Sequence, residues 1–187
     1  MLFVLVFLAG SVGFAFGRSD SVAAHNKVDT GFLQDMRIHH EQAVTMSVVY
    51  LGASKNGDAL LRTIAREIML DQSKESGRMA QMLRMFSESE TNESEIAMTW
   101  MGMPVPLEEM TGMASDAELH ALYKSRDAAA DKIFATLMIA HHKGGVDMAK
   151  YVVDHGKNPE VVALAETIVK YQNSEINELK KILAKLS

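Results

Sequence analysis

Apolar residues recur at helical spacing over most of the chain. Between residues 58 and 86, for example, Leu61, Ile64, Ile68 and Met79 continue a pattern of mostly three- and four-residue steps. Similar patterns cover about residues 29–50, 126–154 and 158–186. Gly52 follows the first of them, and Asn158-Pro159 opens the last, as expected at helix ends and starts. The pattern predicts an all-α protein with four long helices.

The periodicity is interrupted in the middle of the chain. A polar, acidic stretch at residues 87–95 is followed by a Met-rich connection at 97–113. Gly102, Pro104, Pro106 and Gly112 exclude a continuous helix there. A shorter helical piece is predicted to begin at Ser115, because Glu118 follows at the spacing of a capping box.

The two halves of the chain repeat each other. Residues 32–46 read FLQDMRIHHEQAVTM and residues 134–148 read FATLMIAHHKGGVDM, which align at a separation of 102 residues. The repeat continues at a separation of 100 residues, where a Gln-x2-Glu motif occurs at Gln72 and Glu75 and again at Gln172 and Glu175. Such repetition indicates a duplicated unit. We therefore expect two αα-hairpins, residues 29–86 and 126–186, packed as a ferritin-like four-helix bundle.

Composition narrows the class of protein. The 187 residues suit one domain, and 48% of them are hydrophobic, which is enough for a core. The net charge of −5 and the lack of a basic stripe argue against a nucleic-acid partner. There is no cysteine, so disulfides, thiolate nucleophiles and Cys-based zinc sites are excluded. Fourteen methionines are many for such a chain.

The N-terminal segment favours export. Residues 1–17 contain no charged side chain but are shorter than the roughly 20 residues of a typical membrane span. We predict a signal peptide or membrane anchor at residues 1–24, followed by the bundle domain at 25–187. The protein would be periplasmic or extracellular, either soluble after cleavage or anchored. The alternative is a buried N-terminal helix of a soluble domain.

The repeated motif carries metal-binding atoms on one helix face. At 100° per residue, Met36, His39, His40 and Met46 fall within an arc of about 120° around the small residue Ala43. Imidazole is a borderline ligand and thioether a soft one, so this set suits Cu(I) or its mimic Ag(I), with zinc or Cu(II) as alternatives. The competing interpretation is a purely structural polar core. The predicted ligands are Met36, His39, His40, Met46, Met138, His141, His142 and Met148.

Two further groups have open roles. The Gln-x2-Glu residues Gln72, Glu75, Gln172 and Glu175 are either partners that orient the histidines or exposed polar positions of amphipathic helices. The Met-rich connection either adds ligands or forms a hydrophobic flap over the bundle, anchored by Trp100. Its candidate ligands are Met101, Met103, Met110, Met113 and the nearby His120.

These motifs resemble the family called domain of unknown function 305. The resemblance rests on the two M-x2-HH-x5-M helices, the Q-x2-E helices and the Met-rich connection, and it covers about residues 29–186. It implies a ferritin-like four-helix bundle, export and, in some members, periplasmic copper binding and copper resistance. Many relatives have a longer connection that is richer in His and Met, so the short one here argues against high-capacity copper storage. The eight predicted ligands are the positions that match the family motif.

The hypothesis favoured by the sequence is a non-enzymatic, exported copper-binding protein that acts in copper buffering, trafficking or tolerance. Its expected partners are the metal ion, the membrane through the N-terminus, and a copper-transfer protein or a second copy of the chain. One alternative is a ferritin-like di-metal redox protein, although the Glu-x2-His motif of such centres is missing. Another is a metal-free helical module that docks a membrane partner.

Overall fold

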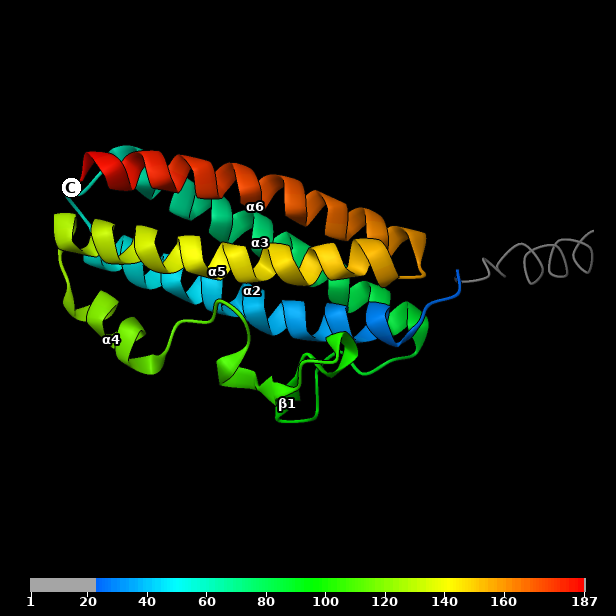
Figure 1. Cartoon of the computed structure of the whole chain (residues 1–187). Helices are drawn as coiled ribbons and strands as arrows, with labels where there is room; N and C mark the ends of the chain where they lie inside the picture. The colour runs from blue at the N-terminus through cyan, green and yellow to red at the C-terminus, as the bar shows by residue number, and fades with distance from the viewer. Residues whose placement is uncertain (1–22, 187) are drawn as a thin grey trace, which may run out of the picture.

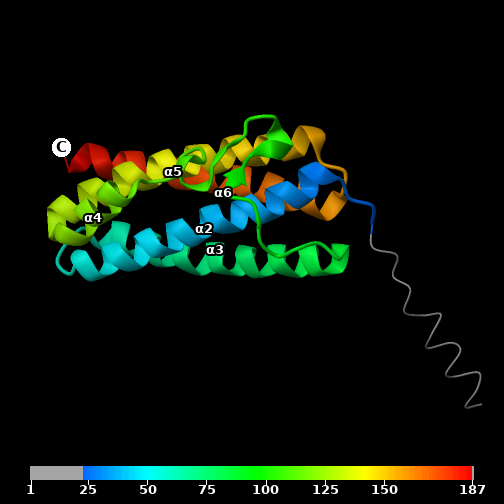
Figure 2. The ribbon, with the colours of Figure 1, turned by 90° about the horizontal axis from the view of Figure 1, so that it is seen from below.

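Four long helices run side by side in a computed structural model that describes residues 23–186 (Figures 1 and 2). The mostly helical architecture predicted from the sequence is confirmed. The signal or anchor predicted at residues 1–24 falls almost wholly outside the described part. No helix within residues 23–186 is long and apolar enough to cross a membrane. The helices are α2 (Lys27–Ala53), α3 (Ala59–Phe86), α4 (Asp116–Lys124), α5 (Asp127–His155) and α6 (Pro159–Lys185).

Polar side chains at the N-termini fix where the helices begin. Asn26 and Ser115 each form a capping box, the latter with Glu118 as predicted, while Asn158 accepts hydrogen bonds from the first free backbone N–H groups of α6. The end of α2 differs from the prediction, because the helix continues past Gly52 to Ala53. Gly52 has open space around its Cα and a helical backbone, so it does not stop the helix.

Helices α2 and α5 are antiparallel neighbours that bury the repeated motif between them (Figure 1). Tyr50 of α2 stacks on Phe134 of α5, with ring centroids 4.2 Å apart. Two apolar clusters divide the core, and one contains Phe134 while the other contains Phe32. The four histidines of the motif lie between these clusters along α2 and α5, and all are fully buried. The core is therefore two apolar layers separated by a histidine layer.

Two buried aspartates lock each half of the bundle to the turn of the other half. Asp29 of α2 accepts hydrogen bonds from the backbone N–H groups of Lys157 and Asn158, in the α5–α6 turn. Asp131 of α5 accepts one at 2.7 Å from the backbone N–H of Asp58, in the α2–α3 turn. These aspartates are 102 residues apart, the same separation as the His-His motifs. Each hairpin thus supplies an aspartate that binds the turn of the other hairpin, and the two aspartates occupy equivalent positions of the repeat.

The connection between the halves forms a strap, residues 96–114, across α2 and α5. Figure 1 shows it on the side opposite α3 and α6, and Figure 2 views that side directly. Two short strands, β1 (Ile96–Ala97) and β2 (Val105–Pro106), pair antiparallel. One 3₁₀ turn, Thr99–Met101, lies between them, and a second, Leu107–Glu109, follows β2. The absence of a continuous helix agrees with the Gly and Pro residues there.

Candidate metal centre

The imidazole rings of His39 and His141 are in direct contact at the centre of the bundle. Their centroids are 3.7 Å apart and their planes are inclined by 31°. Each ring belongs to the first histidine of a His-His pair, so the pseudo-twofold repeat brings equivalent residues together. The ring of His142 lies 6.2 Å from that of His141. A single layer of the core thus holds all four imidazoles.

Hydrogen bonds orient three of the four rings. Nε2 of His40 contacts a carboxylate oxygen of Glu75 at 2.8 Å, and Nε2 of His142 contacts one of Glu175 at 2.7 Å. Nε2 of His39 contacts the backbone carbonyl of Thr111 at 3.2 Å. Carbonyl and carboxylate oxygens only accept hydrogen bonds, so Nε2 donates in all three rings. In the neutral form of these three rings, Nδ1 then carries the lone pair.

None of these Nδ1 atoms has a hydrogen-bond partner. Nδ1 is buried and unpaired in His39, His40, His141 and His142, and in His141 the Nε2 atom is unpaired as well. Buried polar atoms are normally paired, because leaving one unpaired costs about 1–3 kcal/mol. Imidazoles whose far nitrogen is held by a carboxylate or carbonyl are the usual form of histidine ligands to a metal. The layer therefore offers oriented lone pairs without another use in the fold.

Burial keeps the central pair uncharged. The pKa of His39 is lowered to about 3, first by burial and then by the nearby His40, although the bond to Thr111 acts in the opposite direction. The pKa of His141 is also well below its ordinary value, because of burial and of its neighbour His39. A neutral imidazole can donate its lone pair to a metal without first losing a proton. Both rings meet that condition at neutral pH.

The four predicted methionine ligands lie on either side of the histidine layer. Met36 and Met148 belong to one apolar cluster, Met46 and Met138 to the other, and all four are fully buried. Since α2 and α5 are antiparallel, each cluster receives one methionine from each motif. The thioethers therefore form one pair at each side of the imidazoles along the bundle axis.

Three of the Gln-x2-Glu residues, Glu75, Gln172 and Glu175, lie next to the histidines. Besides the two glutamates that hold His40 and His142, Gln72 and Gln172 are buried, with 3% of their surface exposed. A Cβ atom added to Gly145 would lie 2.5 Å from Oε1 of Gln172 and 3.2 Å from Cε1 of His39. The side chain of Gln172 thus approaches the central ring through space that the glycine leaves free.

The strap contributes unequally to the centre. Met110 is buried, Met101 and Met113 are partly buried, and all three pack on the cluster that holds Met36 and Met148. Met103 is 54% exposed, and His120 is exposed on α4. Within residues 23–186, no three His, Cys, Asp or Glu side chains are grouped closely enough to hold one ion together. Any ion in the histidine layer would thus need thioether or amide donors beside the imidazoles, or a shift of the side chains.

The sequence interpretation missed the residues that place the strap on the histidines. Asp35 is buried and accepts hydrogen bonds from Asn92, from the backbone N–H of Met98 and from the indole of Trp100. An acidic residue on the same helix face as Phe32 and Met36 was a visible signal for it. Gly144 provides the second contact: a Cβ there would lie 2.0 Å from the carbonyl oxygen of Thr111. The consecutive glycines at 144 and 145, inside a helix, could have indicated this close approach.

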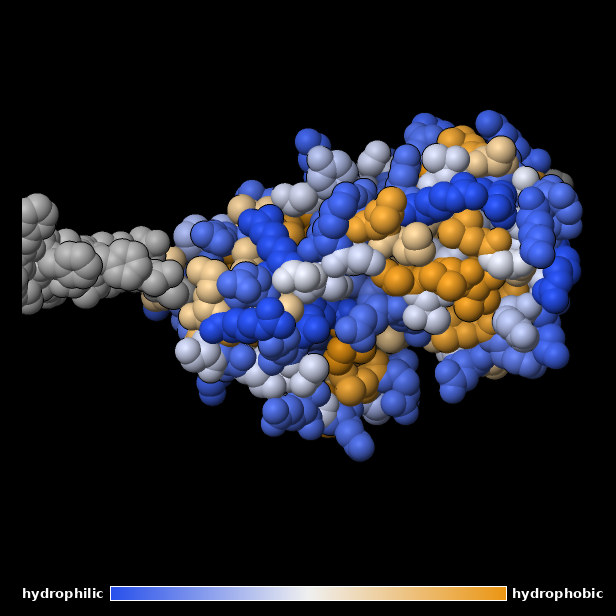
Figure 3. All heavy atoms as spheres, turned by 180° about the vertical axis from the view of Figure 1, so that it is seen from behind, coloured by the Kyte–Doolittle hydropathy of each residue, from blue (hydrophilic) through white to orange (hydrophobic). Residues whose placement is uncertain are grey.

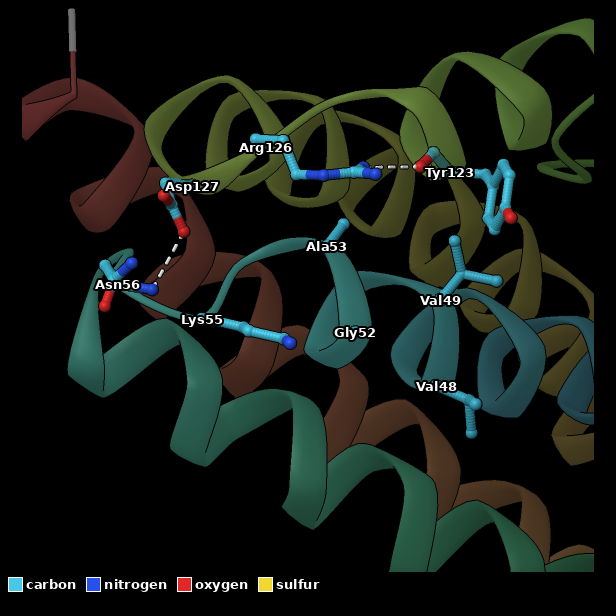
Figure 4. A pocket seen from close by; sticks show the side chains of 9 residues that line it. All are labelled: Val48, Val49, Gly52, Ala53, Lys55, Asn56, Tyr123, Arg126 and Asp127. Atoms are coloured by element: carbon cyan, nitrogen blue, oxygen red, sulfur yellow. Dashed lines mark hydrogen bonds between the residues drawn. The ribbon is translucent and has the colours of Figure 1, made fainter.

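One surface hollow is remote from this layer. Figure 4 shows this hollow, of about 530 Å³, at the end of α2, where Asn56 donates its backbone N–H to Asp127. Its lining residue Gly52 is twelve positions from His40, about 18 Å along the helix. Apolar side chains also gather on the rear face, mainly over the half farther from the N-terminus (Figure 3). The lining of the hollow in Figure 4 includes no His or Met side chain.

Comparison with solved structures identifies relatives with the same architecture. A family protein from Streptomyces coelicolor, proposed in its description to be secreted, has a TM-score of 0.78 and 34% identity, over 85% of this chain and 93% of its own. A DUF305 fragment from Deinococcus radiodurans has a TM-score of 0.72 and 29% identity, over 86% of this chain and 98% of its own. CopM in its Cu(I)-bound form has a TM-score of 0.62 and 27% identity, over 84% of this chain and 96% of its own. CopM has also been solved with Cu(II) and with silver.

Sequence comparison gives a partial match and a family. An uncharacterized protein of Acanthamoeba polyphaga mimivirus is 40% identical over 53 residues, which are 28% of this chain and 35% of that protein. A family model described as a domain of unknown function, DUF305, matches residues 29–183. Because this match contains both hairpins and the strap between them, the chain belongs to the DUF305 family.

Proposed function

We propose that the protein is an exported metal-binding protein that takes up Cu(I), or Ag(I) as its mimic, in the histidine layer. The observation that carries this proposal is the set of four buried Nδ1 atoms without hydrogen-bond partners in His39, His40, His141 and His142. An all-apolar layer would pack the same bundle without that cost. A metal ion bound to the imidazoles would use the lone pairs.

The donor set favours a soft ion. The proposed ligands are the imidazoles of His39 and His141, with sulfur from Met36 and Met148 or from Met46 and Met138. Thioethers carry no charge and bind soft ions, so a site without thiolate or converging carboxylates suits Cu(I) better than zinc. Cu(II) and Zn(II) remain alternatives if only the imidazoles bind. The Cu(I)-, Cu(II)- and silver-bound structures of CopM support a copper-related role in this family.

The role in the cell follows from the class of site. A site of His and Met side chains suits copper buffering, trafficking or tolerance, and we propose a non-enzymatic role. Export is supported by the apolar residues 1–17 and by the Streptomyces coelicolor relative. Methionine ligands resist oxidising conditions in which cysteine thiolates would be lost. A partner that delivers or accepts copper, or a second copy of the chain, completes the proposal.

An anaerobic Cu(I) titration against a competing chromophoric chelator tests the proposal. We expect tight binding by the unmodified protein and its loss when His39, His40, His141 and His142 are replaced by Ala. The matched control replaces the other three histidines, His25, His120 and His155, and should bind like the unmodified protein. Circular dichroism should show that both variants stay helical, since Ala favours helix. Cu(I) binding that survives in the first variant would refute the site.

A further inference from the structure

A groove between α3 and α6 opens to solvent beside the histidine layer. It has a volume of about 340 Å³ and lies on the side of the bundle opposite the strap (Figure 1). Gln72 and Glu75 line it from α3, and Gln172 and Glu175 line it from α6. The two glutamates are the same ones that hold His40 and His142. The groove is thus the solvent side of the histidine layer.

The buried amides in this groove have no structural partner. The nitrogen and the oxygen of Gln72 and of Gln172 are all inaccessible and unpaired. Each unpaired amide destabilises the fold by about 1–3 kcal/mol, so a leucine at either position would be the more stable choice. The amide of Gln172, on α6, also approaches Cε1 of His39, because both lie near the position that a Cβ atom on Gly145 would occupy. Both amides line the groove, and that of Gln172 lies toward the ring of His39.

Charge in the groove favours cations. Its lining includes the carboxylates of Asp71, Glu75 and Glu175, and one positive group, Lys74, which pairs with Asp71 at 2.9 Å. A cleft lined by one sign of charge raises the local concentration of the opposite ion. The opposite face is closed, because the carbonyl of Thr111 rests on His39 and on the backbone of Gly144. The groove is therefore the more open of the two approaches.

We propose that this groove is the entrance by which a metal cation reaches His39 and His141. The carboxylates attract the hydrated ion, and the amide oxygens of Gln72 and Gln172 replace its water as it passes into the layer. The strap closes the opposite side of the layer and stays in place while the ion enters. This inference rests on the proposed function, because it assigns a route to the metal of that site.

Replacing both glutamines by leucine separates an entrance from a binding site. An entrance residue changes the rates of uptake and release together and leaves the affinity unchanged. The measurement is the concentration-independent rate at which Cu(I)-loaded, full-length protein releases its metal to excess bathocuproine disulfonate, in the absence of oxygen. We expect the double variant Gln72→Leu/Gln172→Leu to release Cu(I) roughly tenfold more slowly, as the loss of about 1.4 kcal/mol of ion–amide contact implies. Its equilibrium affinity should stay within about threefold of the original.

The matched control acts on the strap side. Gln42 of α2 holds the strap by two hydrogen bonds to the backbone of Ala114, at 2.8 and 2.7 Å. Gln42→Leu removes the same chemical group and should leave the release rate unchanged. Faster release in this variant, with no effect in the groove, would place the route under the strap and overturn the proposal.

The remaining outcomes are also decisive. A groove variant that binds more weakly and releases faster would make the amides ligands and contradict an entrance. If the double variant does not fold, Gln72→Leu and Gln172→Leu alone carry the same prediction with smaller effects. An unmodified protein that binds no Cu(I) would refute the proposed function and the entrance together, whereas normal binding with unaltered rates would refute the entrance alone.

Discussion

The rings of His39 and His141 meet at a centroid distance of 3.7 Å, and Nε2 of His39 also contacts the carbonyl oxygen of Thr111 at 3.2 Å. Two fully buried imidazoles in contact cannot both carry charge without strong repulsion. The pKa values of both rings are lowered, mainly by burial and secondly by a neighbouring histidine. The apolar layers on both sides and the strap above them hold the pair in place.

We predict that the metal-free protein loses stability as the pH falls below about 6.5. In the unfolded chain His39 takes up a proton near its ordinary pKa of 6.5, while in the fold its pKa is about 3, and His141 shifts in the same direction. Protons therefore bind the unfolded state first, and each histidine lowers the free energy of unfolding by up to about 1.4 kcal/mol per pH unit in this range. Denaturant unfolding at pH 7, 6 and 5 measures the slope.

A variant without these two imidazoles provides the control for the pH effect. His39→Leu/His141→Leu should show a nearly flat dependence between pH 6.5 and 4.5. The carboxyl groups with lowered pKa, Glu90, Glu118 and Asp127, affect stability only below about their ordinary values of 4.5 and 3.8. An unchanged slope in the variant would show that the buried pair is not the source.

Asp29 and Asp131 should be among the most sensitive residues of the fold. Besides the backbone of Asp58, the carboxylate of Asp131 accepts hydrogen bonds from the hydroxyl groups of Tyr50 and Ser54, at 2.8 and 2.6 Å. Asp131→Ala leaves these buried donors unpaired and should lower the free energy of unfolding by about 3 kcal/mol. Asp29→Ala should have a similar effect on the other turn. Asp147→Ala, an exposed change on α5, is the control and should stay within about 0.5 kcal/mol.

How far the sequence predicts this structure depends on repetition. The pairing of His39 with His141 could be expected, because duplicated hairpins bury equivalent faces against each other. Asp29 and Asp131 share the same separation of 102 residues, so the signal existed, although it lies just outside the motif with His and Met. The strap has no counterpart in the other half. Its position depends on single contacts such as Trp100 to Asp35, which no periodicity encodes.

The glycine at 144 should be required for closing the strap. A methyl group there would meet the carbonyl of Thr111, which is backbone and cannot swing aside. Gly144→Ala should therefore move the strap and destabilise the protein by about 1–3 kcal/mol, despite the higher helix propensity of Ala. Gly52→Ala, also inside a helix but with open space, should be neutral or stabilise by up to about 1 kcal/mol. Thermal unfolding compares the two, and equal effects would contradict the tight contact.

Replacing the two methionine pairs separately tests which pair, if either, determines the preference of the site for a soft metal. Met36→Leu/Met148→Leu removes sulfur from one apolar cluster, and Met46→Leu/Met138→Leu removes it from the other. Leu keeps volume and apolarity, so each pair of substitutions should cost less than about 3 kcal/mol in stability. If thioether is a ligand, the variant that lacks the coordinating pair of methionines should lose Cu(I) or Ag(I) affinity far more than Zn(II) affinity, because softness is the property removed.

Chelator competition with Cu(I) and with Zn(II) on the same samples measures this difference. A loss confined to one of the two variants would assign the sulfur ligands to that side of His39 and His141. Equal Cu(I) affinity in the unmodified protein and in both variants would make all four methionines core residues. The imidazoles would then form a site without sulfur, for which zinc or Cu(II) is the better match, because nothing in the donor set would remain soft.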